Sequence, residues 1–152
     1  MVQRSPLSTT LSGISGEYFV AAELSRHGYV ASVTLRNTKG IDILASNVNA
    51  TKSVGIQVKT NQSTGKDWVL NKKVESDTAT NLFFVFVRLN GLGAVEYYIV
   101  PRGDVAAFAR KFHQQWLSGS RRDGKPRKDG DMRKFADLEG RYRNRWDLLG
   151  LD

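Results

Sequence analysis

The longest apolar run of the chain is Leu-Phe-Phe-Val-Phe-Val, at residues 82–87. A strand that is apolar on both faces is typical of the centre of a sheet whose two faces are covered. A membrane-spanning helix needs about 20 apolar residues, so this run is far too short to be one. A chain of 152 residues is long enough to bury a core around such a strand. The run therefore predicts an α/β fold with a mixed central sheet flanked by helices.

The apolar pattern predicts further elements on both sides of that run. Apolar and small residues at helical spacing predict a helix over 12–27, with a buried stripe at Ile14, Tyr18, Ala21, Ala22 and Ser25. Alternation and turn residues predict strands over 29–35, 41–46, 54–60, 67–70, 82–89 and 94–100. A helix over 101–117 should bury Val105, Phe108, Phe112 and Trp116, and a last short helix is expected over 141–149. Residues 1–10 are expected to form a polar tail and residues 119–134 a basic loop.

The chain contains no cysteine. Disulfides, cysteine-ligated zinc sites and thiol catalysis are therefore excluded. The first residues lack the apolar segment of a signal peptide. Both observations are compatible with a cytoplasmic protein that does not interact with membranes.

The formal net charge is +8, which favours a polyanionic partner, most often nucleic acid. Residues 121–134 carry seven basic and three acidic side chains, which is half of that net charge. Such a segment is either a solvated loop or a surface that follows phosphates. Its candidate nucleic-acid contacts are Arg121, Arg122, Lys125, Arg127 and Lys128.

A candidate site comes from two strand-like segments, one with Asp42 and one with Gln57-Val58-Lys59. Side chains alternate along a strand, so Gln57 and Lys59 share the face opposite Ile56 and Val58. If the two segments pair, an acid, an amide oxygen and an ammonium group meet on one surface. Taken singly, each of these residues is more typical of a solvated sheet face or a turn.

Together, these groups suit metal-assisted cleavage of a phosphodiester. A hard cation such as Mg²⁺ or Mn²⁺ prefers oxygen ligands. The expected ligands are Asp42, Glu17 on the preceding helix, the side-chain oxygen of Gln57 and the backbone carbonyl of Val58. Lys59 can orient or deprotonate the attacking water and stabilise charge that grows on the phosphate.

Three motifs carry a resemblance to a known family: Ser12-Gly13-Ile14-Ser15-Gly16-Glu17, Gly40-Ile41-Asp42 and Gln57-Val58-Lys59. In this order they resemble the PD-(D/E)XK nuclease superfamily, which includes restriction endonucleases and archaeal-type Holliday junction resolvases. Residues 68–70, 81–87 and 98–101 are similar to uncharacterised bacterial members. The resemblance implies one restriction-endonuclease-like domain over 1–152. It also implies a metal carboxylate at Asp42, a helix acid at Glu17 and a catalytic lysine at Lys59.

The chain departs from the family pattern at two positions. Ile41 stands where the motif has proline, at a variable position. Gln57 stands where it has an acid, which removes one negative charge and should weaken metal binding.

The expected function is a magnesium-dependent endonuclease that hydrolyses DNA, with branched and foreign DNA among its candidate substrates. One alternative is a catalytically inactive nuclease-like domain that binds nucleic acid or a protein partner. Another is a basic α/β module without nuclease ancestry. A homodimer is favoured if both strands of a duplex are cut.

Trp68 is interpreted as core rather than as a base-stacking residue. Trp116 and Trp146 are interpreted as core, and His113 as a surface or helix-end residue.

Overall fold

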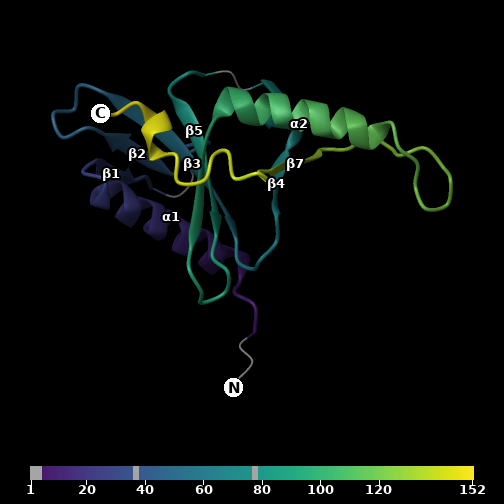
Figure 1. Cartoon of the computed structure of the whole chain (residues 1–152), viewed down its shortest axis with the longest axis horizontal. Helices are drawn as coiled ribbons and strands as arrows, with labels where there is room; N and C mark the ends of the chain where they lie inside the picture. Colours follow the sequence, from purple (N-terminus) through teal and green to yellow (C-terminus); the bar gives the residue numbers. More distant parts are fainter. Residues whose placement is uncertain (1–4, 36–37, 77–78) are drawn as a thin grey trace.

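The computed structural model describes residues 5–35, 38–76 and 79–152. Its main sheet has the strand order β1-β2-β3-β5-β6 and lies between two helices, α1 (Thr9–Arg26) and α2 (Arg102–Leu117) (Figure 1). The strands are β1 (Val30–Val33), β2 (Ile43–Ser46), β3 (Ser53–Asn61), β5 (Leu82–Arg88) and β6 (Glu96–Pro101). β3 and β5 are parallel, and the other neighbours are antiparallel. The mixed α/β fold expected from the sequence is confirmed.

The apolar run forms β5, which packs against a different layer on each face. Phe83, Val85 and Val87 join the core cluster that also contains α1 residues. Phe84 and Phe86 join a second cluster under α2. This division explains why the strand carries no polar residue between its ends.

A second, two-stranded sheet lies within the α2 layer. It pairs β4 (Asp67–Asn71) with β7 (Met132–Ala136), and Trp68 is opposite Phe135. Both rings are buried, so the interpretation of Trp68 as core is confirmed. The end of the predicted basic loop 119–134 belongs to β7, where Arg133 is only 5% exposed. That boundary was wrong because the charged residues conceal the alternation around Phe135.

The face of α1 that packs on the sheet differs from the predicted stripe. Tyr18 is 64% exposed, and the buried residues are Ser12, Gly16, Val20 and Leu24. A Cβ atom at Gly16 would lie 1.8 Å from Oγ1 of Thr60 on β3. The helix therefore approaches β3 through small residues, and apolar spacing alone pointed to the wrong face.

The buried face of α2 also differs from the prediction. Val105 is buried as expected, but Phe112 is 41% and Trp116 is 40% exposed. His113 is buried instead, so its interpretation as a surface or helix-end residue was wrong.

Two short 3₁₀ helices complete the fold, η1 (Lys72–Ser76) and η2 (Trp146–Leu149). Among the described residues, no helix is long and apolar enough to cross a membrane.

Candidate active site at the edge of β3

The second half of β3 extends beyond β2. The pairing of β2 with β3 ends at Ile43 opposite Ile56, whereas β3 continues to Asn61 alongside β5. In the part of the chain that the structure describes, no strand of the main sheet pairs with the other edge of β3 after Ile56. The candidate site lies along this edge.

Asp42 lies directly before β2, where the two strands separate. Its backbone N–H donates to the carbonyl of Ile56 at 2.8 Å. Its carboxylate Oδ2 accepts from the N–H of Val58 at 2.7 Å. The N–H and C=O of a strand residue point to the same side, so the carbonyl of Val58 faces the edge where Asp42 lies. The structure thus brings together two of the oxygen donors that the sequence suggested.

Gln57 and Lys59 lie on the predicted face of β3. They pair with Phe84 and Phe86, whose side chains belong to the α2 layer. Ile56 and Val58 belong to the opposite, α1 layer. Gln57 and Lys59 are both half-buried. The alternation read from the sequence therefore correctly assigned these faces.

Arg102 is a further residue at this site, and sequence reasoning missed it. It is the first residue of α2 and is only 6% exposed. Its Nη2 donates to the carbonyl of Gly40 and, at 3.2 Å, to Oε1 of Gln57. Its guanidinium lies 5.0 Å from the centroid of the Phe84 ring. Arg102 thereby joins the loop before Asp42 to β3, and the amide oxygen of Gln57 is bonded to a cation. Nothing in the sequence distinguishes this arginine from one at the surface.

A cavity of about 490 Å³ opens beside the second half of β3. Val58 and Lys59 line it, together with the first turns of α1 and the start of β4. Asp42, Gln57 and Glu17 are not part of its lining. Glu17 is half-buried and directly follows Gly16, the residue that contacts Thr60. The α1 turn that carries Glu17 is therefore held against β3.

The predicted basic cluster lies far from this edge. Residues 120–126 form a turn with a bridge between Ser120 and Pro126, and the segment projects beyond the end of α2 (Figure 1). Arg127 folds back, with its guanidinium 5.0 Å from the centroid of the Trp116 ring. Arg102 and Trp116 are separated by about 21 Å along α2, at 1.5 Å per residue. The structure therefore does not bring the basic cluster to Asp42.

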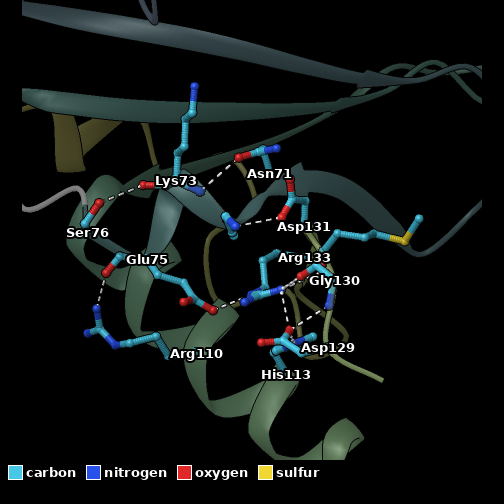
Figure 2. A network of polar contacts seen from close by, with 12 residues as sticks. Asn71, Lys73, Glu75, Ser76, Arg110, His113, Asp129, Gly130, Asp131 and Arg133 are labelled. Carbon is cyan, nitrogen blue, oxygen red and sulfur yellow. Dashed lines mark hydrogen bonds and ion pairs between the residues drawn. The ribbon is translucent and has the colours of Figure 1, made fainter. Parts of the chain in front are cut away.

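A polar network fixes the segment between that cluster and β7 (Figure 2). Buried Arg133 donates to Glu75 of η1 and to the carbonyl of Gly130, and it lies 3.7 Å from Asp129. Nε2 of His113 is 2.7 Å from Oδ1 of the same Asp129. The hydrogen bond to His113 is the main cause that lowers the pKa of the Asp129 carboxyl below its usual value. Residues distant in the sequence thus hold β7 against α2.

No protein-family model matches the chain, and no curated protein matches it. Among solved structures, a bacterial homing endonuclease, I-Ssp6803I, is similar with a TM-score of 0.53. The sequences are 16% identical, and the similarity covers 94% of this chain and 92% of that one. The chain has a nuclease-like fold. At 16% identity this likeness shows the fold alone.

Proposed function

We propose that this protein is a metal-dependent endonuclease that hydrolyses phosphodiester bonds in DNA at the edge of β3. The observation that carries the proposal is the carboxylate of Asp42, bonded to Val58 N–H where β2 and β3 separate. Lys59 follows one residue later and lines a cavity at this edge. The fold shared with a homing endonuclease and the net charge of +8 support DNA as the substrate.

The donor set suits a hard cation, because Asp42, Glu17, Gln57 and the Val58 carbonyl all offer oxygen. Among the described residues, no three His, Asp or Glu gather in a way that could hold a metal. We therefore propose a site with two carboxylates, completed by neutral oxygens and water. When bound, the cation would polarise the phosphate and lower the pKa of a water molecule.

The protein residues would then have distinct roles in hydrolysis. The oxygen of water forms a new bond to phosphorus while the bond to the leaving sugar oxygen breaks. The water loses a proton, and the leaving oxygen gains one. We assign Lys59 to orient that water and to donate to the phosphate oxygens as their charge grows. Arg102 keeps the Gly40 carbonyl and Gln57 together, which positions the loop that carries Asp42.

Two observations favour the inactive, nucleic-acid-binding alternative. Two acids, Glu17 and Asp42, stand against two cations, Lys59 and Arg102, so this group of residues has no excess negative charge to attract a dication. The oxygen of Gln57 is also already bonded to Arg102. A cleavage assay decides between the two functions.

The experiment compares wild type with Asp42→Asn on duplex, branched and single-stranded DNA and on RNA, with Mg²⁺, Mn²⁺ or chelator. We expect wild type to cut DNA only with metal, and Asp42→Asn to lose cleavage. Asparagine keeps a side-chain oxygen for the Val58 N–H, so the free energy of unfolding should change by about 1 kcal/mol or less. Asp67→Asn is the matched control, since this carboxylate lines the cavity but is bonded to Lys134. Equal cleavage by Asp42→Asn would exclude the site, and no cleavage by wild type would favour the inactive alternative.

Cutting both strands of a duplex would require a second active site, so a homodimer remains our prediction. Sedimentation of wild type with and without DNA tests it.

A further inference from the structure

A second cavity, of about 510 Å³, lies between the last turns of α2 and β7. We refer to it as the α2–β7 hollow. Its apolar wall consists of Phe112, Trp116 and Met132, which are 41%, 40% and 60% exposed. Lys128 and Lys134 also line it, and its lining contains no carboxylate residue, although Nζ of Lys134 lies 2.9 Å from Oδ2 of Asp67 on β4. The hollow therefore combines exposed flat apolar groups with positive charge.

The floor of the hollow is a fixed structure. The ring of His113 stacks on Trp116, with centroids 5.5 Å apart and planes at 19°. His113 is held in turn by Asp129, and Arg133 lies under β7 between Asp129 and Glu75 (Figure 2). The carboxylates of Asp129 and Glu75 are thus engaged by His113 and Arg133. Lys128, in contrast, has no acidic partner in the described part of the chain.

The chemistry that fits an aromatic wall beside cations is a planar apolar group with an attached anion. A nucleotide has both parts, because its base can stack on an aromatic ring and its phosphate can contact lysine. The guanidinium of Arg127, 5.0 Å from the centroid of the Trp116 ring, adds a cation next to the hollow, although Arg127 does not line it. The adjoining turn carries Arg121, Arg122 and Lys125, which extends the positive surface.

We propose that the α2–β7 hollow binds an unstacked nucleotide, with its base against Phe112 and the exposed part of Trp116 and its phosphate near Lys128. The proposal rests on the proposed function only for the choice of nucleic acid as partner. The hollow is about 21 Å along α2 from Arg102. At 3.4 Å per nucleotide in a duplex strand, a substrate would span about six steps between the two sites.

Tryptophan fluorescence gives a direct measurement. Of the three tryptophans, Trp68 and Trp146 are 3% and 4% exposed, whereas Trp116 is 40% exposed. We titrate the Asp42→Asn protein, in chelator, with single-stranded oligonucleotides. The expected result is saturable quenching that disappears in Asp42→Asn/Trp116→Phe. Binding measured by anisotropy should persist in that variant, because phenylalanine still offers a ring.

A matched pair of substitutions separates stacking from a general loss of apolar surface. Phe112→Ser should weaken single-strand binding roughly tenfold, since base stacking on an aromatic ring contributes about this much. Phe19→Ser, which changes a phenylalanine that is 43% exposed on α1, should leave the affinity unchanged. Equal affinity for Phe112→Ser and Phe19→Ser would overturn the proposal.

Two further measurements distinguish nucleotide binding in the hollow from electrostatic attraction and from self-association. Heparin has sulfates but no bases, so equal quenching by heparin would reduce the site to electrostatic attraction and overturn the proposal. Sedimentation tests self-association of the Asp42→Asn protein. If that protein self-associates and Phe112→Ser abolishes the association, the hollow is a contact site for a second copy of this chain, and the proposal is overturned. Because binding is measured without cleavage, a failed nuclease assay leaves this test unaffected.

Discussion

The edge of β3 and the α2–β7 hollow are built by different kinds of contacts. At β3, backbone pairing places the candidate residues: Asp42 is bonded to Val58 N–H, and strand register sets the face of Lys59. At the hollow, side chains from η1, α2 and β7 hold one another through Asp129 and Arg133. Groups that strand pairing places can be read from a short stretch of sequence, whereas groups that distant side chains hold together cannot.

Substitutions in the two regions should have different effects. Substitutions at β3 should change the chemical step with little change in affinity. Substitutions near the hollow should change affinity and its salt dependence, and should leave the rate of the bound complex intact.

The largest of these effects is expected for Lys59→Met. Removing one donor to the developing charge should lower the single-turnover cleavage rate by about 10² or more. DNA affinity should change little, because the proposed contact strengthens in the transition state. The measurement is the single-turnover rate together with the dissociation constant. Lys66→Met, an exposed lysine in the turn after β3, is the control. A loss of affinity as large as the loss of rate would make Lys59 a binding residue.

A smaller effect is expected for Arg122→Ala/Lys125→Ala in the turn beyond α2. Arg121 is already 3.5 Å from Asp123, and Arg127 is bonded to the Trp116 carbonyl, so Arg122 and Lys125 are the better candidates for phosphate contacts. Two lost contacts should reduce the slope of log affinity against log salt on duplex DNA by about 1.8. The cleavage rate at saturating protein should stay the same.

Arg26→Ala/Lys52→Ala is the control for that double substitution. It removes the same charge from the end of α1 and the turn before β3, away from the projecting segment (Figure 1). An equal change of slope in both variants would show that net charge alone determines binding. No change in either variant would show that the segment is a solvated loop.

Most of the fold could be predicted because its signals are local. The apolar run of β5 and the alternation of β3 correctly placed strands and faces. The buried face of α1 could not be read, because apolar residues such as Leu11 and Phe19 lie all around the helix. What decides that face is the close approach at Gly16, which depends on Thr60, far away in the sequence.

The candidate site could be predicted only in part, for the same reason. Asp42, Gln57 and Lys59 stand out because two neighbouring strand-like segments carry them, and the structure bonds Asp42 to Val58, which lies between the other two in the sequence. Arg102 reaches Gln57 across 45 positions, and His113 contacts Asp129 across 16. Neither contact leaves a periodic signal, so both residues read as ordinary surface groups.

The smallest effect, on the metal requirement, is expected for Gln57→Glu. If residue 57 binds the metal, as the sequence suggests, a carboxylate there should lower the magnesium concentration needed for half-maximal cleavage. In the structure, however, Oε1 of Gln57 accepts from Arg102. A new carboxylate should pair with that buried guanidinium, so we expect the half-maximal concentration to change by less than about threefold.

The double variant Gln57→Glu/Arg102→Gln releases the carboxylate from this pair and should then shift the magnesium curve to lower concentration. Because Arg102 is buried, its replacement could destabilise the fold, so thermal unfolding is recorded for each variant. Recording it with and without Ca²⁺ also reports metal binding independently of cleavage. A large shift in Gln57→Glu alone, by both measurements, would show that residue 57 reaches the metal despite Arg102. No shift in the folded double variant would place residue 57 outside the metal site. Its role would then be to hold Arg102, and through Arg102 the Gly40 carbonyl, in place beside Asp42.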